Sequence, residues 1–526
     1  MNSWNEGYFT DSTYTYGYYR ELSPHFLRWC LLLKGIAAPE ITEDSCHCEL
    51  GFGQGVSANI HAAAVPGKYF GTDFNPAHAT NANELAEASG ANAKFFEDSF
   101  EEFSKRDDLP QFDSVSFHGI WTWVSAENRR HMLEIVRRHL KSGGMVYNSY
   151  NCLPGWAPNA PLRELLTLYD HYKANGDTNA RVKSAFKFIE DFIAAEPAYA
   201  NIAPNFKSYF DNMKNLNADY IAHEYLNLDW DLMYFVDVVE QCKDAKLDFA
   251  MSAIPMETRQ DMFLPEKARE FFKTVDNPIM IEQLQDYFIN RQFRKDLFVR
   301  GIRRLSRTEA YDKIFNMRYV LLTPPEDVPM EVSTGVRKLN LLEEIYKPVL
   351  EFLAEGNYRP KDLHEYAAKT KIEATTLIEL VTVLVSTGHV MPCQNDNAVK
   401  QVKRSCDRLN AHICERSVYG DAINFLASPL TGCGIEVGRF QQIFLNQYKA
   451  GNKTADKLAE TTWKILSRLG EKFIVEDKQK LSKDDGGAFK YPRKVLETPE
   501  ENLAHTKTLA EKFLTRVPIL RAVLIV

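Results

Sequence analysis

The chain has 526 residues, which is too long for one hydrophobic core and predicts about three domains. Hydrophobic residues make up 45% and charged residues 25%, as in ordinary globular proteins, and the formal net charge of −8 excludes a generally basic surface for nucleic acid. No apolar run reaches the ~20 residues that span a bilayer, and the N-terminal stretch MNSWNEGYFT lacks the basic and apolar regions of a signal peptide. We therefore expect a globular protein with neither nucleic acid nor membrane as a partner.

The cysteines are scattered along the chain, and their only close pair is in the triplet Cys46-His47-Cys48. No second Cys/His pair follows at the distance of a zinc finger, so we interpret the alternation as buried positions of a strand and expect no metal. Reduced thiols in a chain without a signal peptide predict a cytoplasmic protein.

Short apolar runs alternate with helical patterns between residues 46 and 150. Strands that alternate with helices at this spacing indicate a parallel sheet with right-handed crossovers, in an α/β, Rossmann-like fold. Residues 157–240 are mostly helical in pattern and predict an insertion over the sheet, after which two more runs bring the sheet to seven strands. The expected strands are CHCELGF, KYFGTDF, AKFFEDS, FDSVSFHGI, GGMVYNSY, LDFAMSAI (247–254) and RKDLFVRGI (294–302).

The first domain is therefore expected to span residues 1–305. Pro324 and Pro325 mark a break, after which LLEEIYKPVLEFLAEG, RPKDLHEYAAKT and IEATTLIELVTVLVSTGHVMP predict three helices and a short strand. This pattern predicts a winged-helix-like middle domain over 306–398. Because it shows no basic recognition helix, we expect an interaction module rather than a DNA reader. Residues 399–526 are expected to form a mainly helical C-terminal domain.

The segment ELGFGQG lies at the turn from the first strand to the first helix. Its glycines let the backbone turn tightly and approach a ligand closely, and the helix that follows presents free N–H groups. Dinucleotide-binding proteins carry G-x-G-x-x-G, with the last glycine one place later. The G-x-G-x-G form after an acid is typical of S-adenosylmethionine (SAM) sites, because the acid suits a sulfonium cation and would repel a diphosphate. The loop residues expected to bind this cofactor are Glu49, Gly51, Phe52, Gly53, Gln54 and Gly55.

Two further acids end the next two strands. Asp73, in YFGTDFNP, is placed to accept hydrogen bonds from both ribose hydroxyls. Asp98, in FFEDSF, is expected to accept from the adenine amino group, with Phe74 or Phe100 against the ring. Each acid alone is more often a helix cap or a solvated turn residue, but all three in order after the glycine loop favour a SAM site. The other cofactor contacts expected here are Asn75 and Ser99.

The fourth strand ends in FHGIWTWVS. We expect His118, Trp121 and Trp123 to project where the methyl group leaves its sulfonium, with Gly119 also against the cofactor. A general-base role for His118 and a close approach of its backbone to the cofactor both stay open. The Asn/Asp-Pro-Pro-aromatic tetrad of adenine- and cytosine-N-methylating enzymes is absent from this position, which argues against an amino-methylating enzyme of nucleic acid.

The run YTYGYYRELSP is rich in tyrosine, whose apolar body and polar tip suit a wall that is partly dry and partly wet. We expect these tyrosines to form a cofactor lid and substrate channel together with Trp121 and Trp123, and Tyr16 is the one expected to touch the cofactor. Packing of the N-terminal segment against the sheet stays open as the alternative. The expected catalytic residues are Tyr16, His118 and Trp121, and the expected substrate-binding residues are Tyr14, Tyr18, Tyr19, Trp123, Tyr150 and Asn151.

These motifs resemble those of class I SAM-dependent methyltransferases that carry a methyltransferase regulatory domain, a family that includes rickettsial outer-membrane protein-lysine methyltransferases. The resemblance covers most of the chain to about residue 390. It implies a SAM-binding domain over 1–305, S-adenosyl-L-homocysteine as the product, and middle and C-terminal domains that help to hold a protein substrate. The segments that carry it are YTYGYYRELSP, ELGFGQG, GTDFNP, HGIWTWVS, SYNCLPGW, RKDLFVRG and YKPVLEFL.

The resemblance implies a bacterial protein-lysine N-methyltransferase, acting on a lysine-bearing protein such as an outer-membrane protein before its export. A methyltransferase of a small molecule or glycan stays open as an alternative, and so does a non-catalytic SAM-binding regulatory protein. The ordered acids favour catalysis over sensing, and the additional domains favour a macromolecular substrate. The oligomeric state, a homodimer included, stays open.

Overall fold

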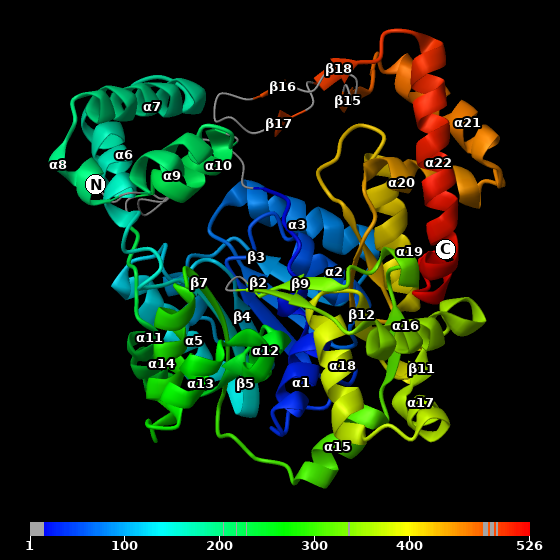
Figure 1. Cartoon of the computed structure of the whole chain (residues 1–526), viewed down its shortest axis with the longest axis horizontal. Helices are drawn as coiled ribbons and strands as arrows, with labels where there is room; N and C mark the ends of the chain where they lie inside the picture. Colours follow the sequence, from blue (N-terminus) through cyan, green and yellow to red (C-terminus); the bar gives the residue numbers. More distant parts are fainter. Residues whose placement is uncertain are drawn as a thin grey trace.

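The computed structural model describes residues 15–526 except 204, 217, 228, 335–336, 477–481, 484–488 and 491–492. A seven-stranded sheet forms its centre, in the order β3-β2-β1-β4-β5-β7-β6 (Figure 1). Neighbouring strands among β1 to β5 pair in parallel, whereas β7 runs antiparallel to both β5 and β6. The predicted seven-stranded Rossmann-like sheet is confirmed. Its strands are β1 (Cys46–Leu50), β2 (Lys68–Thr72), β3 (Ala93–Phe96), β4 (Phe112–Phe117), β5 (Leu140–Asn151), β6 (Asp248–Ser252) and β7 (Phe293–Val299).

Hydrophobic cores lie on both faces of the sheet, as expected for strands that are apolar on both sides. Successive residues of one strand enter opposite cores, since side chains alternate along a strand. Met145 of β5 packs with α1 and α2 on one face, and Val146 packs with α5 and α11 on the other. The helices of this domain are α1 (Pro24–Leu33), α2 (Val56–Ala64), α3 (Pro76–Ser89), α4 (Phe100–Ser104), α5 (Ala126–His139), α11 (Phe235–Cys242), α12 (Gln260–Phe263), α13 (Glu266–Phe272) and α14 (Pro278–Ile289).

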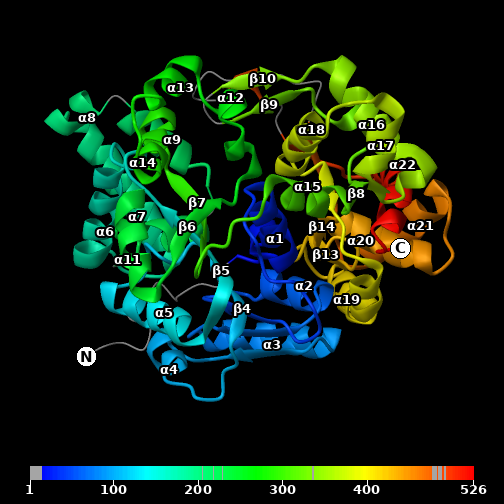
Figure 2. The same ribbon diagram turned by 90° about the horizontal axis from the view of Figure 1, so that it is seen from below.

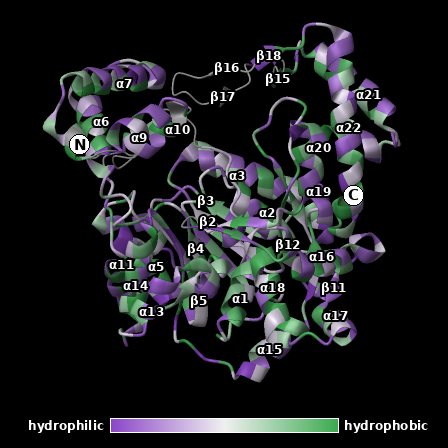
Figure 3. Cartoon of the chain, viewed as in Figure 1, coloured by the Kyte–Doolittle hydropathy of each residue, from purple (hydrophilic) through white to green (hydrophobic). Residues whose placement is uncertain are grey.

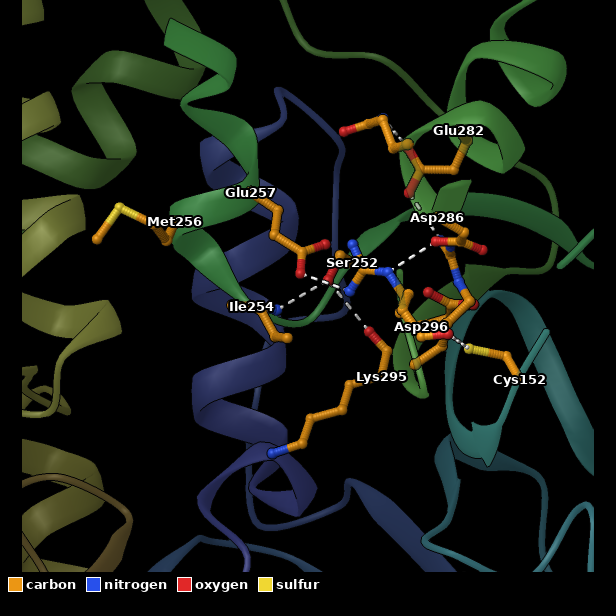
Figure 4. Close-up of polar contacts among 12 residues, drawn as sticks. Cys152, Ser252, Ile254, Met256, Glu257, Glu282, Asp286, Lys295 and Asp296 are labelled. Carbon is orange, nitrogen blue, oxygen red and sulfur yellow. Dashed lines mark hydrogen bonds and ion pairs between the residues drawn. The ribbon is translucent and has the colours of Figure 1, made fainter. Parts of the chain in front are cut away.

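A buried ion-pair network fastens α14 to β7 near the edge of the sheet (Figure 4). The Asp286 carboxylate accepts from Arg294 Nη1 at 2.6 Å and from Arg291 Nε at 2.7 Å. Arg294 also bonds Asp296 at 2.8 Å, and Arg291 reaches Glu257 at 2.7 Å. These side chains are all less than a tenth exposed, so each charge depends on its partners for the solvation that it has lost.

The helical insertion forms a lobe of its own beside the sheet domain, at the upper left of Figure 1. Apolar side chains from its helices, such as Leu162, Ile189 and Phe210, make a separate core. Its helices run from Ala160 to Tyr225, and the predicted bounds of about 157–240 for the insertion stay a prediction. The helices are α6 (Ala160–Lys173), α7 (Thr178–Ala194), α8 (Ala198–Ile202), α9 (Phe206–Met213) and α10 (Ala218–Tyr225).

The middle of the chain holds the three expected helices and a small sheet of three strands, in the order β11-β8-β12. A two-stranded ribbon, β9 with β10, lies before the first of these helices. The elements are α15 (Arg307–Phe315), β8 (Arg318–Leu321), β9 (Glu331–Ser333), β10 (Lys338–Asn340), α16 (Glu343–Tyr358), β11 (Lys361–Asp362), α17 (Leu363–Thr370), α18 (Ala374–Ser386) and β12 (Val390–Pro392).

The C-terminal part is mainly helical, and Figure 3 shows hydrophilic and hydrophobic residues mixed along α20, α21 and α22, as expected for helices with one buried side. Its first helix, α19, lies against α2 (Figure 2), and Arg408 donates to the carbonyls of Glu87 and Ala88 at the end of α3. The elements are α19 (Asp396–Arg416), β13 (Phe425–Ser428), β14 (Cys433–Glu436), α20 (Arg439–Lys449), α21 (Ala455–Arg468), β15 (Ile474–Glu476), β16 (Ser482–Lys483), β17 (Phe489–Lys490), β18 (Arg493–Val495) and α22 (Pro499–Ala522).

One hydrophobic cluster joins the three expected domains. It contains Leu31 of α1, Leu350 of α16 and Leu409 of α19. The parts are therefore packed together, and the boundaries at residues 305 and 398 stay predictions. Within the described residues no helix is long and apolar enough to cross a membrane, and no group of three or more His, Cys, Asp or Glu side chains is arranged to hold a metal ion.

Candidate active site

A cavity opens at the carboxyl ends of β1, β2 and β4, the edge at which the ligands of open α/β sheets bind. The space between its walls, open solvent at the mouth included, is about 1120 Å³. Most of the residues predicted to bind the cofactor line it. These are Glu49, Gly51, Phe52, Gly53, Gln54, Asp73, Phe74, Ser99, Phe100, His118 and Gly119.

Two glycines of the loop after β1 serve different purposes. Gly51 has φ +67° and faces the cavity, and a Cβ there would meet Ile120 at 3.0 Å. Gly55 has φ +72° and caps α2, and a Cβ there would lie 2.5 Å from the Cβ of Ala82 in α3. Gly55 therefore permits close packing of two helices and does not line the cavity, whereas Gly51 shapes the cavity wall directly.

Asp73 lies just after β2 with its carboxylate held in place. Its Oδ2 accepts from the Gly53 N–H at 2.8 Å, and its Oδ1 accepts from the Asn75 N–H at 3.1 Å. The Nδ1 of His78 lies 3.1 Å from the same Oδ1. The loop after β1 and the start of α3 thus orient this carboxylate at the cavity, where the sequence predicted a ribose contact.

Glu49, at the end of β1, is a buried carboxyl group in the cavity wall. Burial raises its pKa to about 8, and the nearby charge of Asp73 adds to the shift. In the free protein the group therefore keeps its proton at neutral pH. A cationic ligand would favour the ionised form and lower this pKa.

The tyrosine-rich segment before α1 forms one wall of the cavity through alternate residues. Thr15, Gly17 and Tyr19 line it, while Tyr16 packs half-buried against the main core. The Tyr19 ring lies 3.8 Å from the His118 ring between centroids, and the Tyr19 N–H donates to Ser57 Oγ at 2.9 Å. Tyr19 thus lies in the cavity wall, and its predicted role in a lid and substrate channel stays a prediction. Tyr16 does not line the cavity, and its cofactor contact also stays a prediction.

The prediction that Tyr18 binds substrate in the channel is corrected, because its side chain faces away from the cavity. Its hydroxyl accepts from the Gly434 N–H of β14 and lies 3.2 Å from His61 Nε2, and its ring packs on Phe425 of β13. In an extended segment, neighbouring side chains point to opposite sides, so Tyr18 and Tyr19 cannot share the channel. Tyr18 instead fastens the segment to the C-terminal part. Tyr14 lies outside the described residues.

His118 lines the cavity beneath Tyr19. Its Nδ1 lies 2.9 Å from the Tyr147 hydroxyl and 3.0 Å from Ser149 Oγ. Burial lowers the pKa of His118 to about 3, and the charge of Lys295 acts in the same direction. The imidazole is therefore neutral at pH 7 and a weak proton acceptor, which disfavours the general-base role. Gly119 also lines the cavity, and its N–H donates to Ser149 Oγ at 2.9 Å. A close approach of the His118 backbone to the cofactor stays a prediction.

Three predicted site residues lie in the core instead. Trp121 is fully buried and stacks on Phe117 at 5.5 Å, because the chain leaves β4 in a turn and only Trp123 reaches the cavity. Tyr150 is also fully buried and donates to Asp296 at 2.6 Å. Asn151 accepts from an indole N–H and likewise does not line the cavity. The expectations that Trp121 faces the departing methyl group and that Tyr150 and Asn151 bind substrate in the cavity wall are corrected, because none of the three lines the cavity.

Two predicted cofactor contacts are engaged elsewhere. The Asp98 carboxylate pairs with the guanidinium of Arg106, so a bond to an adenine amino group would have to share or replace that pair. Asn75 caps α3, with its side-chain oxygen accepting from the Ala77 N–H at 2.9 Å. Neither lines the cavity, and their cofactor contacts stay predictions.

Several lining residues were missed by sequence reasoning. His78 is nearly fully buried, and its Nε2 has no hydrogen-bond partner among the described residues. Its position in the first turn of the helix after Asp73 was the available signal. Asp229 comes from the segment between the helical insertion and α11, and no sequence motif indicates that it lines the cavity. The other missed residues are Thr15, Gly17, Leu22, Ser57, Ile120, Val124 and Asn128.

Comparison with known proteins decides the family. Residues 48–144 match the family model described as a methyltransferase domain, and residues 217–300 match the predicted methyltransferase regulatory domain. The protein sll1526 of Synechocystis sp. is 35% identical over 98% of this chain and 99% of its own length. The chain belongs to the SAM-dependent methyltransferases that carry this regulatory domain.

Two rickettsial proteins are also similar to this methyltransferase. RP789 of Rickettsia prowazekii is 25% identical over 70% of the chain and 69% of its own length. The structure of PKMT2 from Rickettsia typhi in complex with AdoHcy matches with a TM-score of 0.65 and 18% identity, covering 96% of this chain and 99% of that one. The second likeness shows that the fold extends through the insertion, middle and C-terminal parts.

The cofactor of this methyltransferase is S-adenosyl-L-methionine, and the cavity chemistry fits it. When bound, it supplies an electrophilic methyl group on a sulfonium cation. Glu49 provides a buried carboxyl for a cationic ligand, and Asp73 a fixed carboxylate at the end of the next strand. Phe74 and Phe100 provide apolar rings in the same cavity.

Proposed function

We propose that this methyltransferase transfers methyl groups to lysine side chains of a protein substrate. The observation that carries the proposal is the chemistry of the cavity wall. Among the described lining residues, Glu49, Asp73 and Asp229 carry carboxyl groups and none is a lysine or arginine. Such a wall favours cationic groups and disfavours the phosphate groups of many small metabolites.

The aromatic part of the wall suits the stem of a lysine. Tyr19 and Trp123 line the cavity, and an aromatic surface can hold an aliphatic chain while attracting the cation at its end. A lysine amine has to lose a proton before it can attack, which at pH 7 costs roughly 4 to 5 kcal/mol. A partly dry site lowers the pKa of the amine by desolvation and reduces this cost. The protein's part is therefore to orient the amine and exclude water.

A protein substrate is supported by the extent of the fold. PKMT2 of Rickettsia typhi, a protein-lysine methyltransferase, shares the architecture along nearly the whole chain, whereas the SAM site itself needs only the sheet domain. We propose that the middle and C-terminal parts, over about 306–398 and 399–526, hold this substrate. An outer-membrane protein met before its export is the specific substrate class that we propose.

The experiment incubates the protein with methyl-labelled SAM and a bacterial lysate. Label is expected in the protein fraction, and the variant Asp73→Ala, which removes the carboxylate fixed beside the glycine loop, should transfer none. Label found only in small molecules or glycans would reject the lysine proposal and favour the alternative substrate. Absence of any transfer, with SAM still bound, would favour a regulatory protein.

A further inference from the structure

We infer that Asp229 and Trp123 form the acceptor subsite of the cavity, where they bind the cationic end of the substrate side chain. This inference rests on the proposed function, because it names the residues that would select lysine. Both residues line the cavity, and Asp229 belongs to the segment that joins the helical insertion to α11. The insertion thus contributes a charge to the active site.

Asp229 is held in position by anchors on both sides of it along the chain. The buried Arg163 of α6 donates to the Asn227 carbonyl before it. After it, the Asp231 N–H donates to the Thr122 carbonyl at 2.9 Å, and the Asp231 carboxylate accepts from Arg129 at 2.6 Å. The half-buried Asp229 therefore lies between two anchored residues, Asn227 and Asp231, and lines the cavity.

Aromatic packing joins Trp123 to Trp230, the residue that follows Asp229 in the chain. The Trp123 ring packs on Trp230 at 6.0 Å, and Trp230 packs edge-on against Trp156 at 5.3 Å. The guanidinium of Arg163 lies 4.6 Å from the Trp230 ring centroid, and this cation–π contact helps to hold the Trp230 ring in place. Trp123 is only 8% exposed and contributes its accessible edge to the cavity, next in sequence to the lining residue Val124.

The division of charges assigns Asp229 to the substrate rather than to the cofactor. Glu49 and Asp73 lie at the ends of β1 and β2, where the cofactor-binding loops converge. Asp229 comes from outside the sheet, and the lining residues Trp123 and Asn128 come from the chain after β4. With no lysine or arginine among the described lining residues, a third carboxyl group is suited to an ammonium group.

The test uses n-butylammonium, which reproduces the lysine side chain without its backbone, and n-butanol as its neutral counterpart. Binding to the protein saturated with S-adenosylhomocysteine is followed by saturation-transfer NMR. We expect butylammonium to bind at least about tenfold more tightly than butanol, equal to about 1.4 kcal/mol, and Asp229→Asn to remove this preference. Equal preference in Asp229→Asn and the wild type would overturn the inference.

A matched control is Asp191→Asn on the insertion helix α7, whose side chain is 63% exposed and pairs with the solvent-facing Lys187 at 2.7 Å. It should keep the preference for butylammonium. Asp229→Asn should also retain its affinity for S-adenosylhomocysteine within about twofold, because a tenfold loss would assign Asp229 to the cofactor instead and reject the inference.

The lysate experiment separates the two claims. If label reaches lysine equally well with Asp229→Asn and the wild type, the subsite is rejected while the lysine function stands. If butylammonium binding depends on Asp229 but label never reaches a lysine, the cationic subsite stands and the lysine function is rejected.

Discussion

The substitution Glu49→Gln should make the protein more stable than the wild type at pH 8 and change little at pH 4. Burial raises the pKa of Glu49 from 4.5 to about 8. Between these two values the folded protein holds a proton that the unfolded chain has released, so unfolding releases a proton and the stability of the wild type falls as pH rises. At about 1.36 kcal/mol per pH unit, this window amounts to about 5 kcal/mol at most.

The assay is chemical denaturation of both proteins at pH 5, 6, 7 and 8. Every other titrating group is common to both, so the difference in unfolding free energy isolates Glu49. The difference should grow in favour of Glu49→Gln at each step and level off above pH 8. A difference that stays constant from pH 5 to pH 8 would refute the reasoning, since it would mean that Glu49 has no raised pKa in the folded protein.

Binding of the cofactor should show the complementary dependence. A cationic ligand favours ionised Glu49, so the affinity of the wild type for SAM should rise by up to about tenfold per pH unit below pH 8, relative to that of Glu49→Gln. Calorimetry on both proteins measures this ratio and cancels the titration of the ligand itself. If the ratio of the two SAM affinities did not change with pH, the ionisation of Glu49 would not be linked to binding of the cationic cofactor.

Four further substitutions test the fold and the lid. Gly55→Ala should lower the free energy of unfolding by about 1 to 3 kcal/mol, because its Cβ would meet Ala82 at 2.5 Å and φ is +72°; unchanged denaturation would contradict the packing assigned to it. Asp286→Asn should lower it by about 3 to 5 kcal/mol, since two buried guanidinium groups would lose a charged partner, and a loss below 1 kcal/mol would mean that the network relaxes freely. Tyr19→Ala should weaken SAM binding, measured by calorimetry, and methyl transfer, because Tyr19 faces the cavity. Tyr18→Phe should leave methyl transfer unaltered and lower the free energy of unfolding by about 1 kcal/mol, measured by thermal unfolding, because the Tyr18 hydroxyl bonds the C-terminal part. The reverse pattern would contradict the opposite directions assigned to the two side chains.

The sheet was predictable because local signals agree along its whole length. Each strand is a short apolar run bounded by glycine, proline or polar residues, as in KYFGTDF before Pro76. The position of Glu49 and Asp73 at strand ends followed directly, since the carboxyl ends of parallel strands meet at one edge. The glycine loop was equally readable, because Gly51 has a backbone conformation that other residues rarely adopt.

The side-chain directions at the cavity were less predictable. In an extended segment, odd- and even-numbered side chains point to opposite sides, and the tyrosine spacing does not show which set faces the cavity. Tyr18 and Tyr19 were therefore equivalent candidates. Trp121 and Trp123 lie two apart, and a strand would have sent them to the same side, but the chain turns after β4 and only Trp123 reaches the cavity. The free energy gained by burying such large rings, rather than their position in the motif, determines whether they lie in the core or in the cavity wall.

Long-range contacts left no local trace. Arg106 engages Asp98 and Gly434 engages Tyr18, and neither partner could be assigned before the chain was folded. Asp229 reaches the cavity only because Arg163 and Arg129 hold the segment around it from separate helices. A single sequence carries no pattern for such an arrangement.

The most direct test of the central claim is the chemical identity of the methylated product. Protein labelled by wild-type enzyme and methyl-labelled SAM is hydrolysed, and its amino acids are resolved by mass spectrometry. The account predicts label on the Nε of lysine, with none formed by Asp73→Ala. Label on another amino acid, a glycan or a small molecule alone would contradict it.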